Sequence, residues 1–348
     1  MSPSALTLQR KDRKTVNGKD LILAGDIGGT KTHLALFSVR EGKLQSELKK
    51  TFPSKQYPGL EAVVEEFLAS PHDSIGGACF GVAGPVVNGT IKTPNLPWIV
   101  EVAKIGAILK LHSVALLNDL EAAAYGIVTL AAHEFLCLNQ GVARRPANRA
   151  LIAAGTGLGE ATIYDDGHEY HPLASEGGHA DFAPRNETEI DLLRYLIKAY
   201  GHVSYERVVS GPGLWNIYNF LKDSGRVTEP GWLKEKLAAA DDPSVAISQL
   251  GLSGESEICA NALDIFASVY GAEAGNSALR AKAIGGVYIG GGIAPKIQNK
   301  LRDGTFMRAF IDKGRYQELL SEISVQVILN DETALQGAAY YAALHSRE

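Results

Sequence analysis

The sequence has few cysteines, and they lie far apart. Only three occur in 348 residues, at Cys79, Cys137 and Cys259, and no two of them have a C-x-x-C spacing. A disulfide framework or a zinc site needs more cysteines at closer spacing. The cysteine usage therefore predicts a chain that works in a reducing compartment, and we expect the cytoplasm.

Long apolar runs and an excess of basic residues are also missing. No apolar run approaches the roughly 20 residues of a membrane-spanning helix, and the net charge of −5 argues against a nucleic-acid partner. Residues 1–18 are basic but contain no apolar segment of the kind found in a secretory signal, so we expect a flexible tail. We expect neither a membrane nor a nucleic acid as partner.

The composition that remains is that of an ordinary globular protein. Hydrophobic residues make up 45% and charged residues 21% of the chain. A length of 348 residues predicts two domains, each able to bury a core of its own. We expect a smaller α/β domain of residues 19–128 with 329–348, and a larger α/β domain of residues 129–328.

Residues 21–39 are the most informative stretch. An apolar run over residues 21–24 predicts a buried strand, and period-two alternation over residues 32–39 predicts a second strand. A glycine-rich turn with one acid lies between them. Its residues are Gly25, Asp26, Ile27, Gly28, Gly29 and Thr30.

This strand–turn–strand order excludes two common phosphate loops, since a Walker loop and a dinucleotide fingerprint both continue into a helix. A hairpin whose backbone amides and Thr30 hydroxyl face a phosphate remains, because glycine places no Cβ in the way. Asp26 would repel that phosphate unless a cation lay between them, and Mg²⁺, held through water, is the expected one. An ordinary glycine-rich hairpin is the alternative.

The pattern recurs at residues 150–164. A short apolar strand over residues 150–154 is followed by the turn Gly155-Thr156-Gly157 and by another extended segment. Two such hairpins, one in each half of the chain, are difficult to explain as chance turns. They predict two domains that contact one polyphosphate.

Polar residues follow other predicted strands. Asn118 and Asp119 come directly after the strand over residues 113–117, where ligands bind in α/β sheets. A helix cap, with Asn118 as N-cap and Glu121 closing a capping box, is the competing interpretation. In the proline-stiffened loop of residues 93–98, Asn95 and Trp98 offer an amide and a flat apolar face to a sugar, although a packed loop with a buried tryptophan is equally plausible.

Two further glycine segments carry candidate ligand contacts. Glu176 and His179 flank two glycines, which makes a helix unlikely and favours a loop that binds a polyol. The strand over residues 283–289 ends in Gly290, Gly291 and Gly292, where a flat base or ribose could lie against backbone, or where a helix and a strand could cross closely.

Taken in order, these motifs resemble the bacterial glucokinase family of the actin/hexokinase-like ATPase superfamily. The resemblance covers residues 20–348 and also includes the segment Ser210-Gly211-Pro212-Gly213. It implies a two-domain actin-like ATPase (ribonuclease H-like) α/β fold with a cleft between the domains. The related ROK sugar kinases carry a His/Cys zinc cluster after Glu-Gly-Gly-His. Residues 180–185 contain no cysteine, which disfavours that branch.

The resemblance also implies an activity, namely ATP- and Mg²⁺-dependent phosphorylation of the 6-hydroxyl of glucose, with glucose 6-phosphate entering glycolysis. Asp119 would be the catalytic base, and the adenosine would lie at Gly290–Gly292. The sugar contacts would come from Asn118, Glu176, His179 and Glu206, and we add Asn95 from its loop. We also expect a homodimer.

Other functions stay open at this point. Mannose, fructose or an N-acetylhexosamine could replace glucose, and ADP or polyphosphate could replace ATP. A sugar-sensing repressor would need a DNA-binding module, for which the segment before the first strand is too short. A filament- or chaperone-type ATPase would share the hairpins but lack the Glu-Gly-Gly-His constellation.

Overall fold

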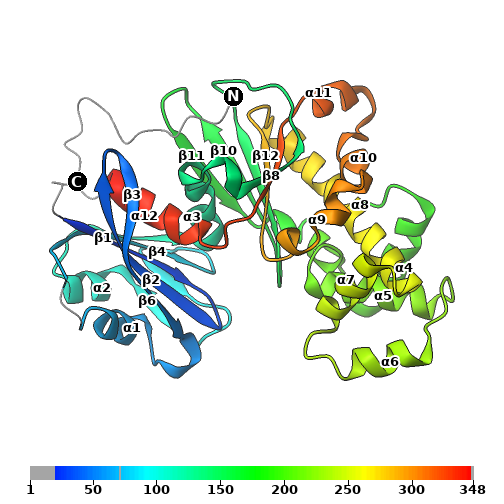
Figure 1. The fold of residues 1–348 in the computed structure, drawn as a ribbon, viewed down its shortest axis with the longest axis horizontal. Helices are drawn as coiled ribbons and strands as arrows, with labels where there is room; N and C mark the ends of the chain where they lie inside the picture. The colour runs from blue at the N-terminus through cyan, green and yellow to red at the C-terminus, as the bar shows by residue number, and fades with distance from the viewer. Residues whose placement is uncertain (1–19, 70–71, 346–348) are drawn as a thin grey trace. The chain divides into compact units, whose positions relative to one another are not determined.

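The computed structural model describes residues 20–69 and 72–345. The chain forms two compact units (Figure 1). Unit 1 contains the residues up to Glu134 together with those from Asn330 onward, and unit 2 contains Phe135–Leu329.

Unit 1 is built on a five-stranded sheet of order β3-β2-β1-β4-β7. β1, β4 and β7 are parallel neighbours, whereas β2 and β3 form an antiparallel extension. The strands are β1 (Leu21–Ile27), β2 (Lys31–Arg40), β3 (Lys43–Pro53), β4 (Ile75–Val82) and β7 (Val114–Asn118), with the separate pair β5 (Thr90–Lys92) and β6 (Ile99–Glu101). The helices are α1 (Leu60–Phe67), α2 (Val102–Leu109), α3 (Asp119–Gly126) and α12 (Thr333–His345), with 3-10 turns at η1 (Ser54–Gln56), η2 (Ile127–Thr129) and η3 (Ala132–Glu134).

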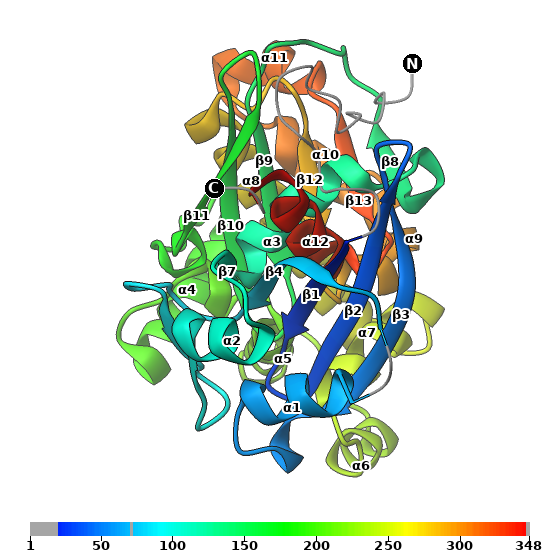
Figure 2. The same cartoon turned by 90° about the vertical axis from the view of Figure 1, so that its left-hand side faces the viewer.

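Alternation along β1 explains why both faces of this sheet are covered. Leu21 and Leu23 belong to a core shared with α1 and α2, whereas Ile22 and Ala24 belong to a core shared with α12. Successive side chains of a strand point to opposite faces, so one short apolar strand supplies both cores. Figure 2 shows α3 and α12 lying together over β1 and β4.

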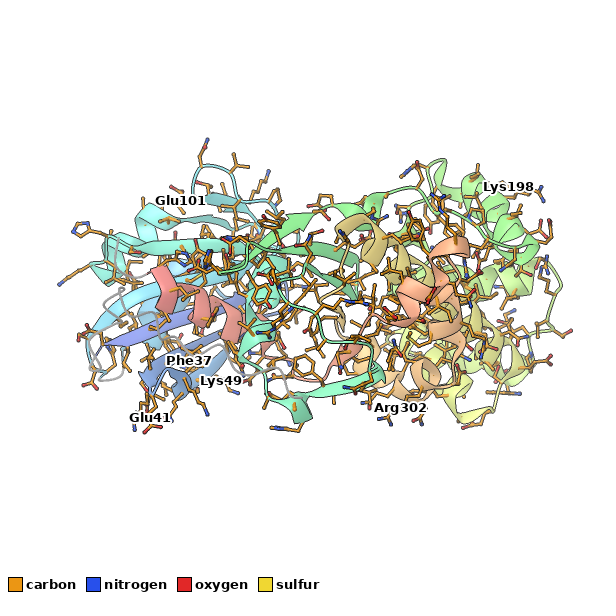
Figure 3. The ribbon with its side chains drawn as sticks, turned by 90° about the horizontal axis from the view of Figure 1, so that it is seen from above. Phe37, Glu41, Lys49, Glu101, Lys198 and Arg302 are labelled. Carbon is orange, nitrogen blue, oxygen red and sulfur yellow. The ribbon has the colours of Figure 1, made fainter. Side chains whose placement is uncertain are left out.

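The edge of this sheet is polar. β3 is exposed along most of its length, and the turn between β2 and β3 places Glu41 at φ 52 and Gly42 at φ 72 (Figure 3). Charged side chains on an edge strand discourage pairing with another chain. Lys49 of β3 is one of them, and it forms an ion pair with Glu332.

Unit 2 contains a six-stranded sheet of order β11-β10-β9-β12-β13-β8. The strands are β8 (Phe135–Asn139), β9 (Arg149–Ala154), β10 (Leu158–Asp165), β11 (Tyr170–Ser175), β12 (Val287–Gly290) and β13 (Val325–Ile328). The helices are α4 (Glu187–Tyr200), α5 (Gly211–Asp223), α6 (Gly231–Ala238), α7 (Pro243–Ser253), α8 (Glu257–Ala281), α9 (Gln298–Arg302), α10 (Thr305–Ile311) and α11 (Gln317–Ser321). Short 3-10 turns lie at η4 (Gly177–His179), η5 (Tyr205–Arg207), η6 (Ala294–Lys296) and η7 (Gly314–Tyr316).

The long helix α8 is the centre of unit 2. It is buried along most of its length and contacts β9, β10, α5, α7 and α10. The hydroxyl of Tyr270 lies 3.3 Å from the amide of Ala154 and 3.3 Å from the carbonyls of Ile152 and Gly290. Through these contacts α8 holds the carboxyl ends of β9 and β12 together.

Several predicted elements agree with the structure. The strands expected over residues 21–24, 32–39 and 150–154 are β1, β2 and β9, and the strand expected over residues 113–117 is β7. The C-terminal helix α12 packs on α3 and β1. Among the described residues, every helix is too short or too polar to cross a membrane.

Candidate active site

The first glycine hairpin connects β1 to β2 in unit 1. The amide of Gly28 donates to the carbonyl of Lys31 at 2.9 Å, and Ser54 Oγ donates to the carbonyl of Gly28 at 2.8 Å. The amide of Ser54 also donates to the carbonyl of Thr30 at 3.0 Å. These bonds fix the turn from η1, and Thr30 is exposed beside it.

Asn95 lies directly against this hairpin. A Cβ added at Gly29 would lie 2.7 Å from Asn95 Cβ, so only glycine allows this approach. Thr93 holds the loop through hydrogen bonds to the carbonyls of Leu96 and Trp98, at 2.9 and 3.1 Å. Trp98 itself is 1% exposed and donates from Nε1 to the carbonyl of Tyr57. The suggestion that Trp98 offers a face to a sugar is therefore wrong, whereas Asn95 is exposed.

Asp26 and Asp119 belong to strand ends at the same edge of the sheet. Asp26 on β1 pairs in register with Gly81 on β4, and Val82 on β4 pairs with Asn118 on β7. A Cβ at Gly81 would lie 2.8 Å from Ala122 Cβ, so this glycine lets α3 approach the sheet. Burial raises the pKa of Asp26 to about 6, and the negative charge of Asp119 adds to the rise.

Asn118 and Glu121 form a helix cap, and Asp119 begins the helix. Asn118 Oδ1 accepts from the amides of Leu120 and Glu121, at 2.8 and 3.4 Å, and Asn118 Nδ2 donates to the carbonyl of Gly84. Burial raises the pKa of Glu121, and the nearby backbone of Asn118 opposes that rise. The N-cap interpretation of Asn118 is therefore confirmed, and the cap holds Asp119 at the end of β7, whereas a ligand role for Asn118 and Asp119 stays a prediction.

Asp26 and Asp119 are suited to a magnesium ion that keeps most of its water, but not to a metal bound by protein ligands alone. Within residues 20–69 and 72–345 there is no cluster of three or more His, Cys, Asp or Glu side chains arranged to hold a metal. Mg²⁺ commonly takes one or two carboxylates and completes its shell with water and substrate phosphates. A buried carboxylate whose negative charge is destabilised by a second carboxylate, beside a glycine hairpin, matches that donor set.

The second glycine hairpin connects β9 to β10 in unit 2. The amide of Gly155 donates to the carbonyl of Gly157 at 2.9 Å, and the amide of Gly211 at the start of α5 donates to the carbonyl of Gly155 at 2.8 Å. Thr156 is exposed at the tip. The positive end of the α5 dipole is thus next to the hairpin, which favours an anion there.

Gly290, Gly291 and Gly292 have different neighbours. Gly291 has φ 80, and a Cβ there would lie 2.2 Å from the carbonyl of Ala154, so this position requires glycine for backbone packing. Gly292 is exposed, and among the described residues no atom lies within 4 Å of its Cβ position. Its amide is 4.0 Å from the Cβ position of Gly155, which makes the two turns neighbours.

Glu176, His179 and Glu206 lie together in unit 2. His179 Nε2 is 4.0 Å from Glu176 Oε2, and His179 Nδ1 is 4.0 Å from Glu206 Oε1. Glu206 Oε2 also accepts from the amide of Leu158 at 3.1 Å, which places it at the second hairpin. The imidazole between two carboxylates offers the donors and acceptors that a polyol requires.

The glycines of this loop serve protein packing. Residues 177–179 form the 3-10 turn η4, rather than an irregular loop. A Cβ at Gly178 would lie 2.0 Å from the carbonyl of Leu158, and a Cβ at Gly177 would lie 2.6 Å from Glu160 Oε2. Both glycines therefore let the turn lie on β10, and Glu176 and His179 are held at its ends.

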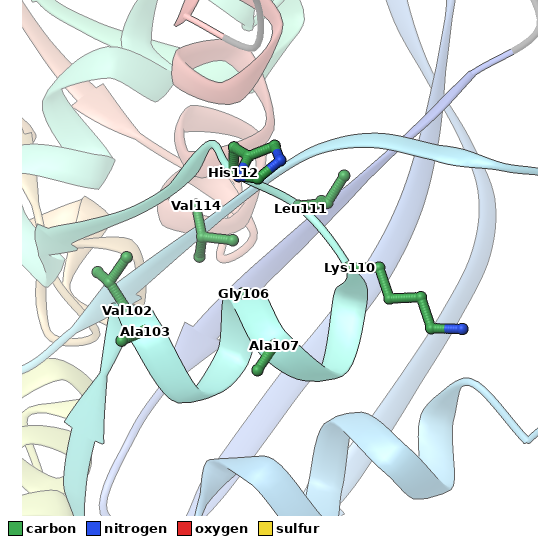
Figure 4. A pocket seen from close by; sticks show the side chains of 8 residues that line it. All are labelled: Val102, Ala103, Gly106, Ala107, Lys110, Leu111, His112 and Val114. Carbon is green, nitrogen blue, oxygen red and sulfur yellow. The ribbon is translucent and has the colours of Figure 1, made fainter.

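The cavity in Figure 4 is at the opposite end of β7 from Asn118. It has a volume of about 530 Å³, and Val114 at the start of β7 and the α2 residues Val102 and Gly106 contribute to its lining. Lys110 and His112 supply its ionisable groups. Its place at the amino end of the strand separates it from the candidate site.

Comparison with known proteins shows the family of this chain. A family model described as Glucokinase matches residues 23–345. The glucokinase of Nostoc sp. is 41% identical over 338 residues, covering 93% of this chain and 99% of the relative. The glucokinase of Synechocystis sp. is 40% identical over 346 residues, covering 92% and 97%.

Solved structures agree as well. A glucokinase from an Antarctic psychrotroph superposes with a TM-score of 0.83 at 31% identity, covering 93% of this chain and 98% of that one. A ROK family glucokinase from Streptomyces griseus, in complex with glucose and AMPPNP, superposes with a TM-score of 0.62 at 22% identity, covering 92% and 99%. The latter likeness concerns the fold alone.

The class is therefore that of the sugar kinases with the two-domain actin-like ATPase fold, which are phosphotransferases with a hydroxyl group as acceptor. Within that class, the chain belongs to the glucokinase family.

Proposed function

We propose that this chain transfers the terminal phosphoryl group of ATP to the 6-hydroxyl of glucose. The observation that carries the proposal is the grouping of Glu176, His179 and Glu206 within 4.0 Å contacts at a glycine hairpin. Three polar side chains that all remain partly exposed are suited to a ligand rich in hydroxyls. Membership of the glucokinase family and relatives named glucokinase support glucose and ATP as the substrates.

Each group of candidate site residues has a defined role in this proposal. Asp119 accepts the proton of the 6-hydroxyl and orients its oxygen for in-line attack. Gly28, Gly29 and Thr30 from the first hairpin, and Gly155, Thr156 and Gly157 from the second, face the phosphates. Gly25 and Ile27, which the sequence also suggested, are buried within β1 and are not assigned a phosphate contact. Gly290, Gly291 and Gly292 border the adenosine, with Gly292 the position whose side-chain space is open.

Charge neutralisation is assigned to Mg²⁺, which Asp26 would hold through water. Sugar hydroxyls are bound by Asn95, Asn118, Glu176, His179 and Glu206. Asn118 Oδ1 already accepts from two backbone amides and Asn118 Nδ2 already donates to one carbonyl, so Asn118 offers a sugar only its second amide hydrogen. The proposal includes a homodimer, which light scattering on the purified protein tests. It also places the enzyme in the cytoplasm.

Glucose kinetics of two variants test the sugar site. Glu176→Ala and His179→Ala should each lower kcat/KM for glucose by roughly 1–3 kcal/mol, because loss of either side chain leaves sugar hydroxyls unpaired. His179 contacts both glutamates, so the double variant should lose less than the sum of the single losses. Basal ATP hydrolysis without sugar should stay at the wild-type rate.

Matched controls are the exposed Glu255→Ala and His168→Ala, which should behave as wild type. If Glu176→Ala and His179→Ala also keep wild-type glucose kinetics, the sugar site is elsewhere. A panel of mannose, fructose and N-acetylhexosamines with ATP, ADP and polyphosphate then identifies the substrates.

A further inference from the structure

A buried cluster of charged residues lies directly beneath the turn that carries Glu176 and His179. Glu160 of β10 is 5% exposed, and Glu273 of α8 is fully buried. Arg280 Nη2 donates to Glu160 Oε2 at 2.8 Å and also to Glu273 Oε1. Two buried carboxyl groups thus share one guanidinium group. Buried acids need compensation for the water they lose, and one cation cannot fully compensate two.

The hydrogen bonds of the cluster indicate which of the two carboxyl groups carries a proton and so offsets the second negative charge. Glu160 Oε2 accepts from Ser277 Oγ at 3.1 Å as well as from Arg280, and Glu273 Oε2 accepts from Asn276 Nδ2 at 2.8 Å. Among the described residues no donor reaches the buried Glu160 Oε1. Burial, with the adjacent charge of Glu273, raises the pKa of Glu160 to about 7. A proton on Glu160 allows a hydrogen bond to Glu273, which two ionised carboxylates cannot form.

The cluster contacts the sugar-binding turn from below. A Cβ at Gly177 would lie 2.6 Å from Glu160 Oε2, so the turn packs on that carboxyl oxygen. Ser175 Oγ donates to the carbonyl of Glu160 at 2.9 Å and accepts from the amide of Gly177 at 3.2 Å. A displacement of Glu160 is therefore transmitted to residues 176–179.

The same cluster reaches the other side of the sugar site. Asn276 Nδ2 donates to the hydroxyl of Tyr205 at 3.0 Å, and Tyr205 precedes Glu206 in η5. The amide of Tyr205 donates to the carbonyl of Ala180 at 3.0 Å, just after η4. Glu160, Glu273 and Arg280 are thus connected to both segments that present sugar ligands.

Other charged groups surround the cluster. Lys313 Nζ donates to Asn276 Oδ1 at 2.7 Å and to the carbonyl of Ala272 at 2.9 Å. Burial and the charge of Arg185 lower the pKa of Lys313, and the charge of Asp312 opposes this. The turn that packs on the cluster carries the ionisable residues Glu176 and His179, and η5 carries Glu206. Burial raises the pKa of Tyr205, which stays neutral at physiological pH.

We propose that Glu160 is a positioning residue for glucose, held neutral against Glu273 and Arg280 so that η4 and η5 keep the geometry of the sugar site. The inference rests on the proposed function. When Glu160 loses its proton, the cluster of Glu160, Glu273 and Arg280 changes from a net charge of 0 to −1. The two carboxylates then repel each other, and Glu160 Oε2 moves against Gly177. The site consequently binds glucose less tightly as the pH rises through neutrality.

The test compares KM values from pH 6 to 8.5 in wild type, Glu160→Gln and the exposed control Glu255→Gln. KM for glucose should rise roughly three- to tenfold with pH in wild type and in the control. Glu160→Gln has the shape of the neutral acid but no ionisation, so its KM for glucose should keep the low value throughout. KM for ATP should be unaffected by Glu160→Gln. Glu176, His179 and Glu206 are present in all three proteins, so the comparison isolates the effect of Glu160.

A second variant keeps the test valid if Glu160→Gln does not fold. Ser277→Ala removes a donor that favours ionised Glu160, so the midpoint of the pH profile should move to higher pH. An identical pH profile in wild type and Glu160→Gln, or an unmoved midpoint in Ser277→Ala, overturns the positioning role. Absence of glucose phosphorylation in the wild type would instead overturn the proposed function.

Discussion

Asp26 shows what one buried carboxylate costs the folded chain. Its pKa rises from 3.8 to about 6 because of burial and the nearby Asp119. Between these two values the folded state binds more protons than the unfolded state. The free energy of unfolding therefore falls as the pH rises through this window and stays lower above it.

We predict that Asp26→Asn reduces the pH dependence of stability in the absence of ligands. Thermal unfolding followed by circular dichroism from pH 4 to 7 should show a smaller decrease in Tm for the variant than for wild type, because asparagine has no proton to lose. The exposed Asp73→Asn should keep the wild-type slope. An unchanged slope in Asp26→Asn would mean that Asp26 is better solvated than its position suggests.

The variant should also lose Mg²⁺-dependent turnover.

Two glycines of unit 2 should have separable effects. A Cβ at Gly157 would lie 2.6 Å from Glu206 Oε2, whereas the space at Gly292 is open. Gly157→Ala should therefore displace Glu206 and impair glucose use in addition to its phosphate contact, while Gly292→Ala should intrude on the nucleotide and raise only KM for ATP. Losses in kcat/KM of roughly 1–3 kcal/mol are expected. Steady-state kinetics that vary each substrate in turn measure both effects, and identical profiles for the two variants would contradict the assignment.

At the scale of elements, the crossing of α3 and α12 fixes the helix that begins at Asp119. A Cβ at Gly337 would lie 1.8 Å from the carbonyl of Ala122, and a Cβ at Gly126 would lie 2.0 Å from the carbonyl of Thr333. The helices can approach this closely only because glycine occupies both positions. The C-terminal helix thus helps to set the position of a residue more than 200 positions earlier in the chain.

We predict that Gly337→Ala destabilises unit 1 by about 3 kcal/mol, since the added methyl group must push α3 and α12 apart. Chemical denaturation measures the change, and turnover should fall as Asp119 moves. Gly231→Ala is the matched control, because among the described residues no atom lies within 4 Å of that Cβ position. Equal stability of the two variants would show that the helices can separate without loss.

The sequence predicted those elements whose signals are local. Period-two alternation and apolar runs located β1, β2 and β9, and the Asn118 cap located the start of α3. Trp98 was ambiguous because burial of a loop residue depends on the core beneath it. The Glu160 cluster could not be predicted, since its partners Ser277 and Arg280 are 117 and 120 positions away, and nothing local marks them.

For the whole molecule, the α/β actin-like fold class inferred from sequence is confirmed by the structural neighbours. The chain passes between the two units at Glu134–Phe135 and at Leu329–Asn330. Asp119 belongs to one unit, whereas Glu176, His179 and Glu206 belong to the other. Sequence motifs could assign residues to each half because each motif follows its own strand.

We propose that Asp119 activates the glucose hydroxyl, and the variant Asp119→Asn removes that function alone. ADP and glucose 6-phosphate are measured by coupled assays with saturating glucose and ATP, and glucose binding is measured by calorimetry. Asparagine keeps the size and hydrogen-bonding reach of the side chain but cannot accept the proton. We predict that kcat falls by roughly two to four orders of magnitude while glucose affinity stays close to that of wild type. A kcat near the wild-type value would show that Asp119 only begins α3, and the proposed mechanism would be wrong.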